Sequence, residues 1–561
     1  MKVALVKPGT PLEIVTNHFS KRKTEIAIAF VRGERLFGSD AYGQLSKKPE
    51  LAVARLLQFL GDHDMEKARH LARKSYLPLK VAYNTTRESL GFMVGDAERS
   101  VEELVAMVLN YAMDITKAYG GNAVKDCVIT VPSFARQDVR EAVVRAADLA
   151  ELRVLSLIDE NTAAAVQFGL DRIYEEKRRV LFYNCGAENV QVSVVEYSTF
   201  FDKSTKSKAV GQLEVLGKGW AVGAGSFALD IAITELLATE FELTVQHTKN
   251  IREFPRPMAK LRAAAKKVKE VLSANAQIPV HVPSVHEDHD LSTTLTRKQL
   301  EKVGAPVFAE LTNPIEAALD MANLTLDDLD AVEIIGGGVR VPRVQEILRD
   351  FFRFQRSKEK PMLDLGMHLN GDEAFALGAA FHGANVSTSF RVRKVGMVDT
   401  LPFNIGIELK STESTMPWQK KASIFKRGVS KYGGKAKTIA FQHDADLTCE
   451  LIYEDQDMAP IALYNITGVA AFARDMKTNS TYKPKIQLSF VLDSSGITTL
   501  SKAEVSLQVN TTARTTNATI LASMNLNAAR IEELDNASSS RAAGEAVKLN
   551  AEATPSNTTT H

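Results

Sequence analysis

Cysteine is scarce in this sequence, and its scarcity limits the chemistry to be expected. Three cysteines occur in 561 residues, at Cys127, Cys185 and Cys449. An odd and small number in so long a chain argues against a disulfide framework and against a zinc cluster. The sequence also has no Cys-x-x-Cys, no His-Glu-x-x-His and no Gly-x-x-x-x-Gly-Lys-Ser/Thr motif. Thiol redox centres, zinc peptidases and Walker-type phosphate loops are therefore not indicated.

Long apolar runs are also missing. No stretch of about 18 apolar residues occurs, so no membrane-spanning helix is predicted. The opening "MKVALVKPGTPLEIV" has an apolar run of four residues that Lys7 and Pro8 interrupt, which does not fit a signal peptide. Asn-x-Ser/Thr sequons are weak evidence for a glycosylating compartment. The candidate acceptors are Asn84, Asn323, Asn385, Asn465, Asn479, Asn510, Asn517, Asn536 and Asn557.

Charge of one sign is lacking as well. The net charge of +1 creates no global field for nucleic acid or acidic membranes, so neither is an expected partner. One basic run, residues 420–437, has seven Lys or Arg and two aromatics, which favours a solvated strand and loop over a nucleic-acid site. The run "HEDHD" at residues 286–290 favours a solvated loop over a metal site. No metal ligand is assigned among these groups.

The length of the chain predicts about three or four domain-sized units, and its composition is that of a globular protein. Residues 1–388 alternate strand-like and helix-like segments, which indicates an α/β architecture. A linker is expected at 389–400. Residues 401–510 carry short β-rich segments between turns, which predicts a β-sandwich. Residues 511–561, rich in Thr, Asn, Ala and Ser, predict a disordered or weakly helical low-complexity tail.

Two segments place glycine turns directly after strands. "VLFYNCGAENVQVSVVEY", residues 180–197, reads as a hairpin with Gly186 in its turn, flanked by Asn184 and Glu188. "IIGGGVRVPRVQE" delivers a strand to Gly336, Gly337 and Gly338 before a helix. Glycines there let backbone N–H groups approach a phosphate, although a plain tight turn remains an alternative.

Three further segments carry candidate groups. In "LIDENTAAAVQFG", Asp159 and Glu160 follow a strand. Either these acidic groups and the hydroxyl cap a helix starting near Thr162, or Glu160 orients a water or hydrated metal. In "AKKVKEVLSANAQ", Lys269 and Ser273 share a helix face that either contacts an adenosine or is solvated. In "GWAVGAGSFALDIAI", Gly225 and Ser226 precede a helix and form either a close-approach turn or a loop.

In this order, the segments resemble the seventy-kilodalton heat-shock chaperone superfamily. "VITVPSFARQDVREAVVRAADLAELRVLSLIDENTAAAVQFGL", "IIGGGVRVPRVQEIL" and "LNGDEAFALGAA" are similar to its actin-like ATPase domain, and "LDSSGITTLS" to its β-sandwich. "VEELVAMVLNYAMDITKAYG" resembles the large endoplasmic-reticulum branch, the hypoxia up-regulated and large glucose-regulated proteins. The resemblance implies a two-lobed α/β ATPase domain followed by an all-β sandwich.

The resemblance also implies a function. An ATP-binding chaperone in the lumen of the endoplasmic reticulum is expected, with ATP or ADP and Mg²⁺ as cofactors and unfolded or extended polypeptides as clients. Nucleotide exchange on the main lumenal seventy-kilodalton chaperone is a second implied role. The family's first phosphate loop and signal peptide are expected before Met1, and its helical lid and retention signal after the last residue.

Site residues follow from the resemblance position by position. Those implied for nucleotide binding are Gly186, Gly225, Ser226, Lys269, Ser273, Gly336, Gly337, Gly338, Arg340 and Asp372. Glu160 and Lys74 are implied as catalytic groups. Several positions depart from the family pattern: Lys266 replaces an acid of the adenosine clamp, Ala221 stands where an Asp is usual, and Asn184 and Gln191 replace two aspartates that hold the hydrated metal.

These substitutions predict weak or absent ATP hydrolysis, because a neutral amide cannot neutralise Mg²⁺ as an Asp does. Two alternatives remain open from the sequence. One is a peptide-binding module whose ATPase region is a pseudo-enzyme, with the sandwich pairing with extended peptides. The other is a sugar-kinase-like enzyme of the same two-lobed fold, in which the β-rich region after Leu401 has no place.

Overall fold

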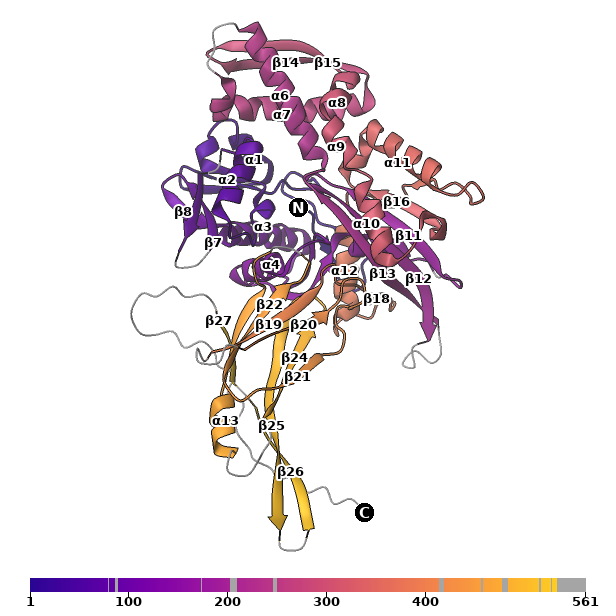
Figure 1. The fold of residues 1–561 in the computed structure, drawn as a ribbon. Helices are drawn as coiled ribbons and strands as arrows, with labels where there is room; N and C mark the ends of the chain where they lie inside the picture. The colour runs from indigo at the N-terminus through magenta and orange to yellow at the C-terminus, as the bar shows by residue number, and fades with distance from the viewer. Residues whose placement is uncertain are drawn as a thin grey trace. The chain divides into compact units, whose positions relative to one another are not determined.

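The computed structural model divides the chain into two compact units, Met1–Pro402 and Phe403–His561, each described here by itself (Figure 1). The structure describes residues 1–78, 80–85, 89–172, 174–201, 209–245, 250–412, 418–455, 458–476, 483–513, 516–525 and 527–531. The predicted helix in the tail and the sequons at Asn479, Asn536 and Asn557 fall wholly or partly outside these residues.

The first unit combines helices and strands in alternation. Its helices are α1 Gly38–Gln44, α2 Met65–Lys74, α3 Val101–Gly120, α4 Gln137–Leu149, α5 Glu160–Gly169, α6 Ser226–Thr244, α7 Pro255–Ala274, α8 Arg297–Val303, α9 Ala305–Ala309, α10 Asn313–Ala322, α11 Pro342–Gln355 and α12 Ala374–Val386. Its strands are β1 Ala4–Leu5, β2 Glu13–Ile14, β3 Ala27–Val31, β4 Glu34–Phe37, β5 Ala52–Ala54, β6 Lys80–Asn84, β7 Ser89–Val94, β8 Ala97–Ser100, β9 Asp126–Val131, β10 Arg153–Asp159, β11 Arg178–Cys185, β12 Asn189–Phe201, β13 Ala209–Val222, β14 Gln277–His286, β15 His289–Thr296, β16 Ala331–Ile335, β17 Leu365–Gly366 and β18 Gly396–Val398.

A six-stranded sheet with the order β17-β16-β11-β12-β13-β18 organises this unit. Strand β11 pairs antiparallel with β12 and parallel with β16, as expected for a hairpin beside a βα segment. Its side chains alternate between two cores: Leu181 and Tyr183 join one buried cluster, and Val180 and Phe182 join another. The hydrophobic run of β11 is therefore that of a strand covered on both faces.

Helices pack closely at glycine positions, both on this sheet and on each other. A Cβ at Gly219 of β13 would lie 2.1 Å from the Pro314 carbonyl oxygen of α10, so the helix backbone rests directly on the strand (Figure 1). A Cβ at Gly378 of α12 would lie 1.8 Å from the Ala163 carbonyl oxygen of α5. Close packing of α5 on α12 fixes the start of α5, where the candidate Glu160 lies.

Helix α3 begins and ends as its sequence predicts. The Ser100 hydroxyl accepts from the Glu103 N–H, and the Glu103 carboxylate accepts from the Ser100 N–H, which completes a capping box. The helix ends at Gly120, and Gly121 follows it with φ of 82°, the left-handed conformation that glycine adopts without strain.

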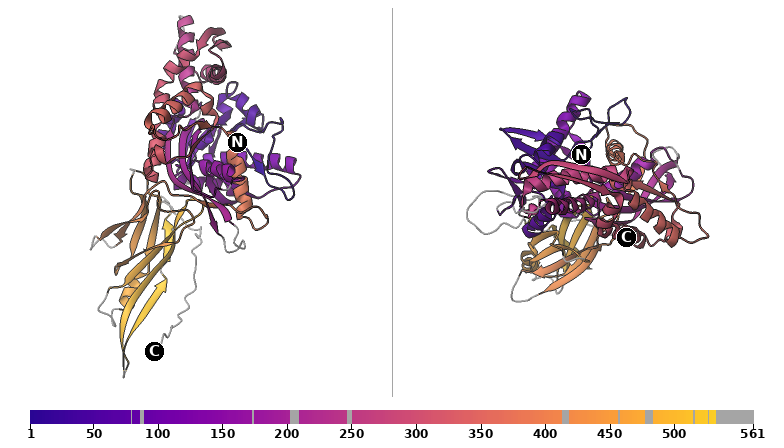
Figure 2. Two further views of the ribbon diagram at one scale, coloured as in Figure 1. Left: turned by 90° about the vertical axis from the view of Figure 1, so that its right-hand side faces the viewer. Right: turned by 90° about the horizontal axis from the view of Figure 1, so that it is seen from above.

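The second unit is rich in strands, as predicted. Figure 2 shows these strands in orange to yellow. One sheet has the order β20-β19-β22-β23-β27 and the other β21-β24-β25-β26. Their bounds are β19 Ile405–Ser411, β20 Gln419–Phe425, β21 Lys437–Gln442, β22 Leu447–Tyr453, β23 Ala462–Thr467, β24 Lys485–Leu492, β25 Thr498–Ala513, β26 Thr516–Asn525 and β27 Asn527–Ile531, with one described helix, α13 Val469–Met476.

Two predictions about the segments outside the main domains differ from the structure. The expected linker 389–400 includes β18, which pairs parallel with β13, and the first unit extends to Pro402. The expected tail begins with strands rather than weak helix, because β26 pairs along β25 and β27 pairs with β23. Tertiary pairing overrides the weak local preference of this Thr-, Asn- and Ala-rich stretch.

Candidate functional site

The glycine turn after β16 packs on the hairpin of β11 and β12. Gly336 has φ of 88°, and a Cβ there would lie 2.4 Å from the Cys185 carbonyl oxygen. A Cβ at Gly338 would lie 2.4 Å from the Cys185 sulfur, whereas a Cβ at Gly337 would meet nothing within 4 Å. The structure therefore brings the two predicted glycine turns together. Two of the three glycines are required by this backbone contact.

The start of α6 closes on the same hairpin. The Ser226 N–H donates to the Gly186 carbonyl at 3.0 Å, and the Phe227 N–H donates to the Ala187 carbonyl at 2.8 Å. A Cβ at Gly225 would lie 2.3 Å from that Ala187 carbonyl oxygen. Gly186, Gly225 and Ser226 thus lie together. Two of the first N–H groups of α6 are already used by the hairpin rather than left for an anion.

Glu160 meets the two amides that stand where the family resemblance implies aspartates. The Gln191 amide nitrogen donates to a Glu160 carboxylate oxygen at 2.6 Å, and the Asn184 amide nitrogen lies 3.4 Å from the same oxygen. The Gln191 amide oxygen accepts from the N–H and hydroxyl of Ser133 at 2.7 and 2.6 Å. Burial raises the pKa of Glu160, and the Gln191 hydrogen bond opposes this rise.

This donor set does not fit Mg²⁺ as a set of aspartates would. Magnesium prefers carboxylate and carbonyl oxygens, but here two amide N–H groups point at the one carboxylate and stabilise its charge in place of a cation. One oxygen, Asn184 Oδ1, is buried without a hydrogen-bond partner among the described residues. The described part of the chain holds no group of three or more His, Cys, Asp or Glu side chains that could bind a metal.

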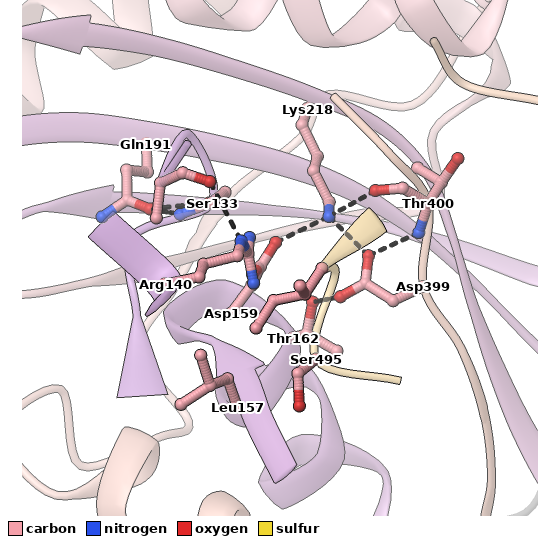
Figure 3. Close-up of polar contacts among 12 residues, drawn as sticks. Ser133, Arg140, Leu157, Asp159, Thr162, Gln191, Lys218, Asp399, Thr400 and Ser495 are labelled. Carbon is pink, nitrogen blue, oxygen red and sulfur yellow. Dashed lines mark hydrogen bonds and ion pairs between the residues drawn. The ribbon is translucent and has the colours of Figure 1, made fainter. Parts of the chain in front are cut away.

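A buried charge network includes Asp159, the residue before Glu160 in the chain (Figure 3). The Lys218 ammonium contacts one carboxylate oxygen each of Asp159 and Asp399 at 2.6 Å and the Thr400 carbonyl at 2.7 Å. Arg140 donates to the other Asp159 oxygen at 2.7 Å. Two cations and two carboxylates therefore balance in a site with almost no solvent exposure.

This network corrects one prediction. The sequence offers helix capping by an acidic side chain as one interpretation of this segment. In the structure, Asp159 makes no side-chain capping hydrogen bond to α5. The helix begins at Glu160, not near Thr162, and the Thr162 hydroxyl donates to Asp399 at 2.6 Å. The buried Asp159 is satisfied by Arg140 and Lys218 instead, because a desolvated carboxylate requires a paired cation.

The predicted adenosine face is engaged within the protein. The Lys269 ammonium pairs with Asp230 of α6 at 2.8 Å and donates to the Ser226 carbonyl at 3.0 Å. The Ser273 hydroxyl donates to the Lys269 carbonyl at 2.9 Å, and Lys266 lies over the Tyr42 ring. Burial raises the pKa of Asp230. These contacts tie α7 to α6.

Two other predicted residues pair with each other at the end of the glycine turn, which is η6 Gly337–Arg340, and a third lies apart. Arg340 donates to the Asp372 carboxylate at 2.6 Å. Burial raises the pKa of Asp372, but the hydrogen bond from Arg340 and the charge of Lys2 outweigh burial and lower this pKa. Lys74, the candidate catalytic lysine, is an exposed residue at the end of α2, and no contact described for it reaches Glu160.

The sequence does not predict two side chains that contact the tip of the β11–β12 hairpin. Arg55 and Gln58 both donate to the Glu188 carboxylate. They come from the segment around η2 Leu56–Gln58, more than a hundred residues away. The Arg55 guanidinium also lies 3.1 Å from the centre of the Phe227 ring at the start of α6. Nothing in the local sequence "VARLLQF" marks Arg55 as a partner of the hairpin.

The sequons lie in varied settings. Asn323 is exposed with φ of 53° at the end of α10, and the Asn385 amide donates to the Val395 carbonyl. Asn84 ends β6, and Asn465 lies within β23. For Asn510 and Asn517 only the strand backbone is described, in β25 and β26. No helix among the residues given structure is long and apolar enough to cross a membrane.

Comparison with protein-family models identifies the family of this chain. A family model described as Hsp70 protein matches residues 2–560. The chain belongs to the Hsp70 family. It is 32% identical over 526 residues to hypoxia up-regulated protein 1 of Cricetulus griseus, covering 90% of this chain and 51% of that protein. The same-named protein of Xenopus tropicalis is 33% identical over 529 residues, 90% of this chain and 80% of that protein.

A plant relative extends the comparison. Heat shock 70 kDa protein 17 of Arabidopsis thaliana is 31% identical over 495 residues, 86% of this chain and 56% of that protein. This Hsp70 chain thus spans about half the length of the plant and hamster relatives. The mixed α/β first unit and the strand-rich second unit are consistent with membership of the family.

Proposed function

We propose that this Hsp70 chain is an ATP-binding chaperone with weak or absent ATP hydrolysis. The observation that carries the proposal is the pairing of Gln191 and Asn184 with Glu160. A hydrolytic site needs a cation beside the transferring phosphoryl group, and here amide donors hold the carboxylate instead. We keep Glu160 as the carboxylate that would orient a water, so slow turnover without strong metal assistance is the expected behaviour.

Nucleotide contact is proposed for the glycine turns. Gly186, Gly225, Ser226 and the 336–338 turn meet at one place, and backbone N–H groups of such turns that are not already bonded within the protein can approach phosphate oxygens. Lys269 and Ser273 are proposed as contacts on the adenosine side, and Arg340 on the adenosine and phosphate side. Asp372 is proposed as an acidic group near the metal and the hinge. Lys74 is kept as the candidate catalytic lysine, which would have to approach from α2.

Client binding is proposed for the second unit. Strands β20 and β21 stand at the ends of their sheets among the described strands, and a sheet edge offers backbone groups to an extended polypeptide. Unfolded or extended polypeptides are the proposed clients. By resemblance to the hypoxia up-regulated proteins, we place the chain in the endoplasmic reticulum lumen, with nucleotide exchange on its main seventy-kilodalton chaperone as a further role.

Two measurements test this proposal. Single-turnover assays with radiolabelled ATP and excess protein should give little hydrolysis, while a titration with the same nucleotide should saturate. Rapid hydrolysis would refute the weak-ATPase part. Binding of an unfolded model peptide should change when ATP is added. Peptide binding that ATP leaves unchanged, together with no nucleotide binding, would favour the ATP-independent peptide-binding alternative.

A further inference from the structure

The tip of the β11–β12 hairpin already holds an anion that belongs to the protein. The Glu188 carboxylate accepts from the Arg55 guanidinium and from the Gln58 amide. The Arg55 side chain is 17% exposed and the Glu188 side chain 36%. Arg55 also covers the Phe227 ring. A cation and an amide donor are thus aimed at the tip of the turn that contains Gly186.

The donors around Glu188 are not fully used. The Arg55 Nε–H is a buried donor without a hydrogen-bond partner in the part of the chain that the structure describes. A carboxylate offers two oxygens, whereas a terminal phosphate offers three and can accept from more of the guanidinium N–H groups. The donor set is therefore larger than the carboxylate that it holds.

Arg55 is held in place at some cost. Its backbone has φ of 62° and ψ of 33°, a left-handed conformation that a residue with a side chain adopts only under strain. Burial, and then the nearby charge of Arg262, lowers the pKa of Arg55 to about 9. The charge of Asp230 opposes this shift. A desolvated guanidinium requires an anion as its partner, and the carboxylate in direct contact with Arg55 is that of Glu188, whose place a bound phosphate can take.

We propose that Glu188 is a specificity-determining residue that occupies an anion position at the hairpin tip and makes the site select nucleoside diphosphates over triphosphates. The inference rests on the proposed binding of nucleotide at this hairpin. A triphosphate reaches the tip with one more negative charge than a diphosphate, and it must displace the Glu188 carboxylate from Arg55 and Gln58. A diphosphate leaves that contact intact.

Calorimetric titrations with ATP and with ADP test this selectivity in the full chain. They are run in magnesium-free buffer, so that the different magnesium affinities of the nucleotides do not contribute. The wild-type protein should bind ADP more tightly than ATP. Glu188→Gln keeps the size of the side chain but removes its charge. It should shift the ratio of the two dissociation constants toward ATP by about tenfold, because the pair is partly solvated.

A matched control separates charge at the tip from general loosening. The Glu235 side chain is 39% exposed, close to the value for Glu188. Like Glu188, it contacts the N-terminal segment, because its carboxylate accepts from the Tyr76 hydroxyl. Glu235→Gln should leave the ratio unchanged. Adding Arg55→Gln to Glu188→Gln should abolish the gain in ATP affinity, because the freed guanidinium provides it.

The outcomes distinguish this inference from the proposed function. A ratio that Glu188→Gln does not change, or that Glu235→Gln changes equally, overturns the role of Glu188 while nucleotide binding stands. Binding of neither nucleotide by the wild type or by Glu188→Gln overturns the proposed function, and the selectivity falls with it.

Discussion

Replacement of Lys218 by Met probes the buried charge network most directly. The substitution keeps most of the side-chain volume but removes the cation that touches both Asp159 and Asp399 at 2.6 Å. Asp159 keeps Arg140, whereas among the described residues Asp399 keeps only neutral donors, from Thr162 and the Thr400 N–H. The stranded charge is therefore that of Asp399.

The expected loss is large on the scale of domain stability. Removing one partner of a buried ion pair costs about 3–5 kcal/mol, against a free energy of unfolding of about 5–15 kcal/mol for a domain. Adding Asp399→Asn to Lys218→Met removes the stranded charge as well, so the double variant should recover at least half of the loss.

Urea unfolding followed by tryptophan fluorescence measures the effect. The chain has two tryptophans, Trp220 and Trp418, so a Trp418→Phe background restricts the signal to the first unit, two residues from Lys218. The rate of amide hydrogen exchange in β18 should rise in Lys218→Met. When β18 separates from β13, the Asp399 carboxylate that follows it can reach water. A loss of stability under 1 kcal/mol, or a double variant less stable than the single one, would refute this reasoning.

Two further predictions concern the packing and titration of the first unit. Gly336→Ala should lower the free energy of unfolding by about 1–3 kcal/mol, because Gly336 has a positive φ and a Cβ there would contact Cys185. Gly337→Ala should have little effect, because a Cβ there would meet nothing. Equal urea midpoints for the two variants would contradict the packing argument. Burial lowers the pKa of His382 to about 4 from 6.5, so its contribution to stability is complete above pH 6.5 and is lost as the pH falls toward 4. At pH 5 the loss relative to pH 7 should be about 2 kcal/mol, and His382→Leu should reduce that pH dependence; an unchanged pH dependence in the variant would contradict the assignment.

Local signals in the sequence predicted much of the fold. The hairpin around Gly186 and the strand-turn-helix around Gly336 are both confirmed. Each depends on residues close together in the chain, such as a glycine at a positive φ, which sequence patterns report directly.

Long-range partners could not be predicted in this way. Arg55 reaches Glu188 and Lys218 reaches Asp399 across more than a hundred residues, and neither cation lies in a recognisable local pattern. The alternating pattern of β13 marks Lys218 only as one residue of a strand. Its ammonium contacts Asp399 and the Thr400 carbonyl, which directly follow β18 in the segment that the sequence predicts to be a linker. The predicted roles of the glycine turns in nucleotide binding stay predictions.

The magnesium dependence of ATP binding tests the central claim most directly. Because amide donors take the place of a cation at Glu160, the dissociation constant for ATP should be the same with Mg²⁺ and with EDTA. A variant with Asn184→Asp and Gln191→Asp should bind ATP more tightly with Mg²⁺ than without. A wild-type protein that binds ATP only when Mg²⁺ is present would contradict the account.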